Sequence, residues 1–158
     1  MKTVVVDIDG TIADTRERAR KYLETSPKDW DKFYDSCAED KPIRPICDLV
    51  QRLACFYDIV FVSGRRESCR ADTESWIMEN LGLELVGVNH VYLRGNGDFR
   101  HDTLVKPELL QAYFDKFGCK QSDVAFILED RNSMVKKWRE LGYTCLQVAE
   151  GDFYWLSL

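Results

Sequence analysis

The chain has 158 residues, a length that suits one domain with its own hydrophobic core. Hydrophobic residues make up 45% and charged residues 31%, a soluble composition that predicts a chain able to fold alone. The net charge of -5 argues against a protein that coats nucleic acid through long-range attraction, but not against one that grips only a terminus.

The N-terminus and the cysteines argue against a secreted or membrane protein. The opening residues, MKTVVVDIDG, reach acidic residues too early for a signal peptide, and no apolar stretch approaches the ~18 residues needed to cross a bilayer. The six cysteines show no C-x-x-C spacing, so we interpret them as buried, reduced thiols. We therefore expect a cytoplasmic protein with no membrane contact.

Short β-branched runs alternate with helical patterns along the chain. Five runs are predicted strands because they are continuously apolar, as in a buried parallel sheet; they span 3–7, 58–63, 90–94, 124–130 and 144–149. Helical patterns occupy about 45–57, 67–81, 106–117 and 132–141, and three of them stop at a glycine: Gly82, Gly118 and Gly142. This alternation predicts an α/β fold with a Rossmann-like, doubly wound parallel sheet and right-handed crossovers.

Residues 14–44 interrupt this alternation directly after the first strand. The segment is polar and charged, with aromatic residues at spacings that suit two short helices. It would lie over the carboxyl edge of the sheet, where ligands bind in open α/β folds. Within a single domain of 1–158, it is either packed scaffold or a small helical cap that acts as a lid, and its Trp30 is a candidate for stacking on a base. The tryptophans expected to serve packing instead are Trp76, Trp138 and Trp155.

The most informative motif is VVVDIDGT, in which an apolar strand ends in Asp7 and Asp9. Residues two apart on an extended strand point to the same side, so the two carboxylates converge at the sheet edge. A bound cation would relieve their repulsion, and oxygen ligands without His or Cys suit Mg²⁺. Gly10 allows a sharp turn and a close approach of the backbone to a ligand.

The sequence DIDGT resembles the first motif of the haloacid dehalogenase (HAD) superfamily, and the other motifs follow in that superfamily's order. FVSGR supplies a hydroxyl residue, Ser63, and N–H groups at a helix start would complete a phosphate cradle. Lys106 in DTLVKPELL fits the lysine motif, with Pro107 in the first helical turn. The phosphate-binding residues implied by this resemblance are Asp7, Gly10, Thr11, Ser63, Gly64 and Lys106.

The superfamily's fourth motif is an acidic pair after an apolar strand, and VAFILEDR supplies Glu129 and Asp130. Glu in the first position departs from the commoner pair of aspartates, which leaves open which of the two touches the metal directly. The resemblance covers nearly the whole chain. It implies a Mg²⁺ site built from Asp7, Asp9, Glu129 and Asp130, with the backbone carbonyl of Asp9 as a further ligand.

The same resemblance implies a reaction. Asp7 would attack phosphorus to form an acyl phosphate, while Asp9 would protonate the leaving oxygen and then activate the hydrolytic water. Mg²⁺, Ser63 and Lys106 would hold the phosphoryl oxygens in line. The expected catalytic residues are therefore Asp7, Asp9, Ser63 and Lys106.

Two longer segments narrow the expected substrate. HVYLRGNGDFRHDTLVK and LEDRNSMVKKWRELGYTCLQVAEGDF resemble the 3'-phosphatase domain of phage-type polynucleotide kinases. This resemblance implies removal of a 3'-phosphate, or of a 2',3'-cyclic phosphate, from DNA or RNA ends in repair. The kinase loop G-x-x-x-x-G-K-[ST] is absent from the sequence, so we expect the chain to act alone or with a separate kinase or ligase partner.

Several arginines near these motifs are candidate contacts to a substrate phosphate, because the guanidinium fork matches phosphate geometry. Each could instead form an ordinary ion pair, and Arg131 could orient the acidic pair beside it. The proposed substrate-binding arginines are Arg65, Arg94, Arg100 and Arg131.

Two other functions stay open on the sequence alone. A 5'(3')-deoxyribonucleotidase, or another small-molecule phosphomonoesterase, shares the first motif and suits the acidic net charge. A non-catalytic binding module with this fold would have lost Asp7 or Lys106, and both are present.

Overall fold

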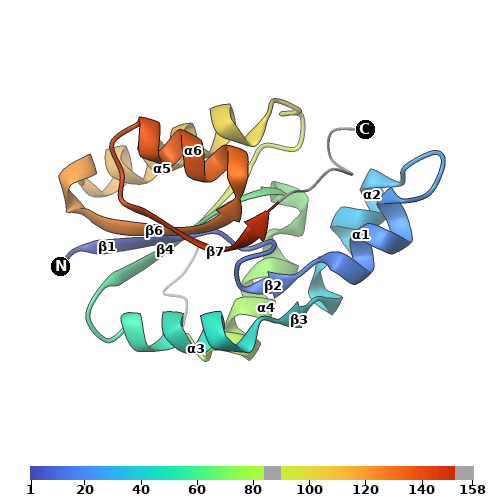
Figure 1. Ribbon diagram of the computed structural model, residues 1–158, viewed down its shortest axis with the longest axis horizontal. Helices are drawn as coiled ribbons and strands as arrows, with labels where there is room; N and C mark the ends of the chain where they lie inside the picture. The colour runs from blue at the N-terminus through green and yellow to red at the C-terminus, as the bar shows by residue number, and fades with distance from the viewer. Residues whose placement is uncertain (84–89, 152–158) are drawn as a thin grey trace.

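The structure, a computed structural model, describes residues 1–83 and 90–151. A five-stranded sheet in the order β5-β4-β1-β6-β7 forms its centre, and every neighbouring pair is parallel (Figure 1). The strands are β1 (Thr3–Val6), β4 (Asp58–Arg66), β5 (Val91–Arg94), β6 (Val124–Arg131) and β7 (Cys145–Gly151). The strand order runs outward from β1 in both directions, which confirms the predicted doubly wound α/β fold.

Helices cover both faces of the sheet. On one face lie α3 (Arg44–Leu53) and α4 (Arg70–Leu81), and on the other lie α5 (Asp102–Phe117) and α6 (Asn132–Glu140) (Figure 1). Neighbouring residues of β1 point to opposite faces, so Val4 and Val6 join the core on the α3 and α4 side while Val5 joins the other. This explains why the strands are continuously apolar in sequence.

The predicted tryptophan packing is confirmed for two of the three residues. Trp76 lies buried in the core beneath α3 and α4, and Trp138 lies buried in the core beneath α5 and α6. Trp155 lies outside the described residues.

The glycine stops are confirmed, but three element boundaries were predicted wrongly: the end of α3, which lies at Leu53 rather than at about residue 57, the start of α5 and the end of β4. Gly82 and Gly118 end α4 and α5 in the left-handed conformation, at φ of 61° and 67°. Helix α5 begins at Asp102, four residues earlier than predicted, so Pro107 lies inside the helix rather than in its first turn. Pro107 therefore leaves one backbone hydrogen bond of this helix unmade. Strand β4 continues past Ser63 to Arg66.

Residues 13–42, which we call the cap, follow the first strand. Two short strands, β2 (Ala13–Asp14) and β3 (Lys41–Pro42), pair antiparallel and hold the ends of the segment together. Between them lie α1 (Arg16–Leu23), α2 (Trp30–Asp35) and a 3₁₀ turn, η1 (Cys37–Glu39). Figure 1 shows α1 and α2 at one end of the molecule, beyond the carboxyl edge of the sheet. A lid function of the cap stays a prediction.

The cysteines are all free, and four of the six are buried: Cys37, Cys47, Cys69 and Cys145. Cys119 is half-buried, and Cys55 is exposed because it follows the last turn of α3, so the prediction of burial was wrong for Cys55. Among the described residues, no helix is long and apolar enough to cross a membrane.

Candidate active site

The loop after β1 brings Asp7 to the carboxyl edge of the sheet. The backbone N–H of Asp7 donates to the carbonyl of Leu128 on β6 at 3.0 Å, which extends the pairing of the two strands. Gly10 then reverses the chain at a φ of 83°. The turn places the Thr11 hydroxyl where it donates to Asp7 Oδ2 at 2.9 Å and to Asp130 Oδ1 at 3.3 Å.

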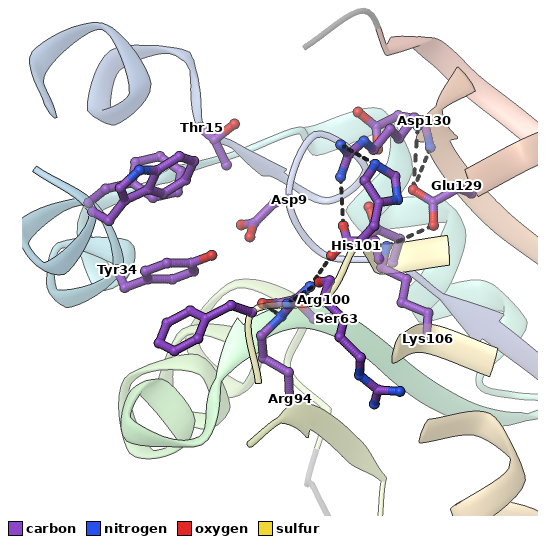
Figure 2. Close-up of a pocket in the computed structure, with 17 residues that line it drawn as sticks. Asp9, Thr15, Tyr34, Ser63, Arg94, Arg100, His101, Lys106, Glu129 and Asp130 are labelled. Atoms are coloured by element: carbon purple, nitrogen blue, oxygen red, sulfur yellow. Dashed lines mark hydrogen bonds and ion pairs between the residues drawn. The ribbon is translucent and has the colours of Figure 1, made fainter. Parts of the chain in front are cut away.

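Three buried carboxylates, which we call the acidic cluster, meet at this edge: Asp7, Glu129 and Asp130. Each offers one oxygen, and these oxygens lie within 4.8 Å of one another. Lys106, on α5, is also buried, and its Nζ donates to Asp7 Oδ1 at 2.7 Å and to Glu129 Oε2 at 2.8 Å (Figure 2). The end of β1, the end of β6 and the first turns of α5 therefore build one site.

The charges in this cluster suit a divalent cation. Burial, together with the negative charge of Asp7, raises the pKa of Glu129 to about 7 and that of Asp130 to about 10. Burial opposes the charge of Lys106, yet Asp7 and Glu129 raise its pKa. One ammonium thus faces three carboxylates, and a divalent ion bound by oxygen ligands would supply the missing positive charge.

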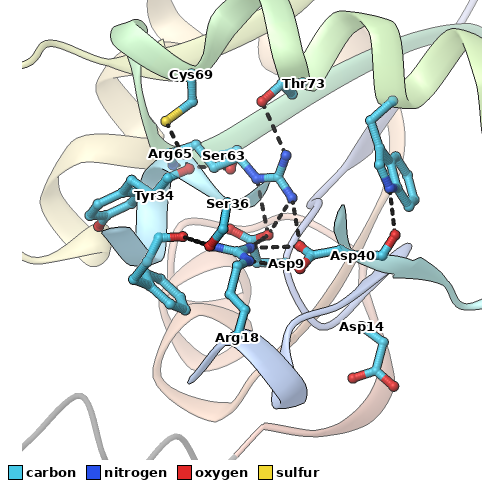
Figure 3. Close-up of polar contacts among 12 residues, drawn as sticks. Asp9, Asp14, Arg18, Tyr34, Ser36, Asp40, Ser63, Arg65, Cys69 and Thr73 are labelled. Carbon is cyan, nitrogen blue, oxygen red and sulfur yellow. Dashed lines mark hydrogen bonds and ion pairs between the residues drawn. The ribbon is translucent and has the colours of Figure 1, made fainter. Parts of the chain in front are cut away.

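The side chain of Asp9 does not join this cluster. Its Oδ1 accepts hydrogen bonds from Arg65 Nε at 3.0 Å, from Arg65 Nη2 at 2.7 Å and from Arg18 Nη2 at 3.0 Å (Figure 3). Burial alone would raise its pKa, but the two guanidinium groups lower the pKa of Asp9 to about 2. The expectation that the Asp9 carboxylate contacts the same cation as Asp7 is therefore not met in this arrangement.

Asp40, from the cap, completes the network around Asp9. Arg18 Nε donates to its Oδ1 at 2.7 Å, and Arg65 Nη2 donates to its Oδ2 at 3.2 Å. The remaining Arg65 nitrogen, Nη1, donates to the Thr73 hydroxyl on α4. The Arg65 side chain has no solvent exposure, and its described partners are all protein groups. In this geometry it orients Asp9 rather than contacting a substrate.

A second network surrounds Asp102, at the start of α5. Its carboxylate pairs with Arg94 and accepts from Arg131 Nη1 at 2.9 Å, while Arg131 Nη2 lies 3.2 Å from His101 Nε2 (Figure 2). A side chain at Gly64 would meet this carboxylate, because an added Cβ would lie 2.7 Å from Asp102 Oδ1. Close packing of β4 against the start of α5 therefore requires glycine here.

The four predicted substrate-binding arginines thus have different surroundings. Arg94 is buried, and beyond Asp102 it donates to the carbonyls of Gly64, Asp98 and Arg100. Arg100 is exposed and pairs with Asp98 and Glu108. Among the four, Arg100 and Arg131 keep the most exposed side chains, at 48% and 18%.

Asp9, the acidic cluster and the network around Asp102 line one cavity of about 290 Å³ (Figure 2). Ser63 lines it from β4, where its hydroxyl accepts from the backbone N–H of Arg65 at 3.1 Å. Ser63 and Gly64 lie inside β4 rather than at a helix start, since α4 begins only at Arg70, and phosphate binding by these two residues stays a prediction. The lining residues that came from the sequence motifs are Asp7, Asp9, Ser63, Gly64, Lys106, Glu129 and Asp130.

Among the residues that the sequence analysis missed are three charged ones at the centre of these networks: Arg18, Asp40 and Asp102. Asp102 precedes Lys106 by four residues, so a helix predicted to start at Asp102 would have placed both on one face. For Arg18 and Asp40 the sequence gives no signal, because only the folding of the cap brings them to Asp9.

The sheet, the insertion after its first strand and the lysine beside an acidic cluster define a phosphatase of the HAD class. Within that class, the chain belongs to the family described as the polynucleotide kinase PNKP phosphatase domain, which matches residues 1–153.

Known proteins resemble the chain over most of its length. A protein of Autographa californica nuclear polyhedrosis virus, named as a bifunctional polynucleotide kinase/RNA ligase, is 28% identical over 142 residues; the match covers 89% of this chain but only 18% of that protein. A chain of the Pnkp1/Rnl/Hen1 complex has a TM-score of 0.70 at 25% identity, covering 97% of this chain and 47% of that one. CbbY from Rhodobacter sphaeroides, in complex with phosphate, has a TM-score of 0.64 at 14% identity over 98% of this chain and 88% of its own, which shows the fold alone.

Proposed function

We propose that the protein is a Mg²⁺-dependent phosphatase that removes a 3'-phosphate from nucleic acid ends through an aspartyl-phosphate on Asp7. The observation that carries the proposal is the position of Asp7. Its carboxylate lines the cavity and lies in contact with Lys106 and Thr11. A nucleophile beside a fixed ammonium is what phosphoryl transfer requires.

The acidic cluster fits the implied metal, since it offers oxygen ligands that lack balancing charge. Asp7, Glu129 and Asp130 would hold the ion. A bound Mg²⁺ would supply positive charge to the oxygens of the phosphoryl group beside Asp7. Lys106 contributes a second positive charge at the same edge of the sheet.

The first half of the reaction transfers the phosphoryl group to Asp7. A carboxylate oxygen of Asp7 forms a bond to phosphorus while the bond to the sugar O3' breaks, and the departing oxygen takes up a proton. We assign that proton to Asp9. Because Arg65 and Arg18 favour the ionised carboxylate, Asp9 must first gain this proton, and Oδ2, which accepts none of the three guanidinium hydrogen bonds, is the oxygen open to it.

The second half returns the enzyme to its starting state. Ionised Asp9 accepts a proton from water, the water oxygen bonds to phosphorus, and the bond from phosphorus to Asp7 breaks to release inorganic phosphate. The hydrogen bonds from Arg65 and Arg18 favour the ionised form of Asp9 that this step needs.

Family membership and two arginines that line the cavity support a nucleic acid substrate. The matching viral protein and the matching complex carry names that refer to polynucleotide or RNA repair chemistry, and the chain covers less than half the length of each. In this chain, Arg100 and Arg131 line the cavity beside the acidic cluster and provide guanidinium groups for a substrate phosphate. We extend the proposal to a separate ligase partner, which would join the 3'-hydroxyl product, or a separate kinase partner, which would phosphorylate the 5' end.

One assay panel tests this function. Oligonucleotides with a 3'-phosphate, a 5'-phosphate or a 2',3'-cyclic phosphate are compared with mononucleotides under saturating Mg²⁺. We expect the highest kcat/KM on the 3'-phosphate, no turnover by Asp7→Asn, and reversible loss with EDTA. Asp48→Asn, which removes an exposed carboxylate from α3, is the control and should keep full activity. A preference for mononucleotides would instead identify a nucleotidase.

A further inference from the structure

Aromatic side chains form one wall of the active-site cavity. Trp30, Phe33 and Tyr34 reach it from α2 of the cap, and Phe99 reaches it from the loop between β5 and α5. Figure 2 shows Tyr34 across the cavity from Lys106 and Glu129, with Asp9 between them. The cavity therefore has a charged side where a phosphate would bind and an aromatic side facing it.

The rings of this wall are held in place from behind. Trp30 and Tyr34 lie almost parallel, with centroids 6.2 Å apart and an interplanar angle of 28°. The guanidinium of Arg66 lies 4.4 Å from the centroid of Tyr34 and 5.7 Å from that of Phe99, and an ion pair with Asp31 at 2.9 Å fixes it. Tyr34 and Phe99 line the cavity and Arg66 does not, so Arg66 braces both rings from outside the cavity.

Packing explains part of this wall but not all of it. Phe33 is buried in the small core of the cap, and Trp30 and Tyr34 pack partly against it. Phe99 is 79% exposed, so its ring contributes little to the core. The guanidinium of Arg66 contacts the rings of both Phe99 and Tyr34, and so links the loop before α5 to the cap.

We infer that this wall, formed by Trp30, Tyr34 and Phe99, is a stacking site for the nucleobase of the terminal, phosphate-bearing nucleotide. The inference rests on the proposed function. Every nucleobase offers a flat π-face to an aromatic ring, so such a site tolerates different sequences. The phosphate would lie at the acidic cluster while the attached base lies against the rings.

The size of the cavity adds a requirement on the substrate. A volume of about 290 Å³ is at the lower end of the range for small-ligand sites, so the size of the cavity suits one terminal nucleotide. A terminal base that stacks on this wall cannot at the same time be paired with a base of the opposite strand. The enzyme should therefore act on an unpaired 3' end.

The test compares two single-stranded oligonucleotides that differ only in the last nucleotide. Both carry a 3'-phosphate; one has a normal terminal base and the other has an abasic terminal sugar. The readout is the ratio of their kcat/KM values. In the wild type this ratio should be on the order of 10, because base–aromatic stacking contributes about one decade or more in affinity.

Phe99→Ala and Tyr34→Leu should each lower this ratio by several-fold. Phe99→Ala is the cleaner variant because its ring is largely exposed, and Tyr34→Leu keeps apolar bulk in the cap. Melting temperatures show whether each variant is folded. Phe56→Ala removes a ring that is 74% exposed and follows α3; as the matched control, it should leave the ratio unchanged.

A wild-type ratio near 1, or the same ratio in both variants as in the wild type, would overturn the stacking site. Failure of the proposed function would look different, since neither oligonucleotide would then be hydrolysed although small phosphate esters were. A several-fold lower ratio in both folded variants supports the site.

Discussion

Arg65, on β4, donates two hydrogen bonds to a single carboxylate oxygen of Asp9. Arg18, on α1 of the cap, donates a third to the same oxygen. Because Asp40 accepts from both arginines, two positive and two negative groups meet where the cap contacts the sheet. Asp9 is therefore tied to the cap as well as to the central strands, and a displacement of the cap would change the electrostatic environment of this carboxylate.

The first prediction concerns the stability that Arg65 provides. Arg65→Met should lower the free energy of unfolding by about 3–5 kcal/mol, because it leaves two acidic side chains short of a partner in a buried network. Urea unfolding measures this effect. Arg16→Met breaks an exposed pair with Asp14 and should cost under about 1 kcal/mol. Similar costs for the two variants would show that the buried network adds no special stability.

The second prediction separates catalysis from metal binding. Asp9→Asn should slow turnover by about 10²–10⁴-fold, the usual contribution of a positioned acid or base. The same variant should bind Mg²⁺ with nearly unchanged affinity in calorimetry, because the Asp9 carboxylate faces Arg65 and Arg18 rather than the acidic cluster. Asp130→Asn is the comparison, and it should weaken Mg²⁺ binding. Loss of metal affinity in Asp9→Asn would place that side chain in the metal site after all.

The third prediction is a pH dependence of the metal-free protein. In the folded state the pKa of Glu129 is about 7, against an ordinary value of 4.5, because burial and the charge of Asp7 favour its neutral form. Between these two values the folded chain holds a proton that the unfolded chain has lost, so the stability that Glu129 contributes is fully present below about pH 4.5 and is lost as the pH rises through 7. Thermal melting in EDTA should show this fall.

Bound Mg²⁺ should reverse that trend, since it takes the place of the proton. The rise in melting temperature on adding Mg²⁺ should therefore grow between pH 5 and pH 8 by several degrees. Glu129→Gln is the comparison: it cannot titrate at this position, so its metal-free profile should fall less steeply below pH 7, and the slope that remains belongs to Asp130, whose pKa of about 10 keeps it protonated across this range. A metal-free protein that melts at the same temperature across this range would contradict the buried, proton-holding carboxyl.

Much of the fold follows from local patterns. The continuous apolar runs predict the five strands because both faces of the sheet are covered, as the opposite packing of Val4 and Val5 shows. Gly82 and Gly118 mark helix ends because both adopt a left-handed conformation. The start of α5 was missed because Pro107 is typical of a first helical turn. Only the hydrogen bond from the Thr103 backbone N–H to the His101 side chain, at the N-terminus of the helix, shows that α5 begins earlier.

The residues of the site could be predicted only where they belong to short, contiguous sequence motifs. The contacts of Lys106 with Asp7 and Glu129 join three such motifs. The ion pairs of Arg18 could not be predicted, because they depend on how a 30-residue insertion packs against the sheet edge. An isolated arginine on an amphipathic helix gives no sign of which acidic partner it will meet.

The fourth prediction concerns the narrow contact between Gly64 and Asp102. Gly64→Ala should lower the free energy of unfolding by about 1–3 kcal/mol, because the new Cβ would lie 2.7 Å from Asp102 Oδ1 and displace the carboxylate that pairs with Arg94 and Arg131. Phosphatase activity should fall with it, since both Gly64 and Asp102 line the cavity. Gly95→Ala is the matched control: no atom lies within 4 Å of its added Cβ, and its φ is not left-handed, so stability should be unchanged or slightly higher. If the two alanine variants melt alike and are equally active, the close approach of β4 to α5 does not hold this carboxylate in place.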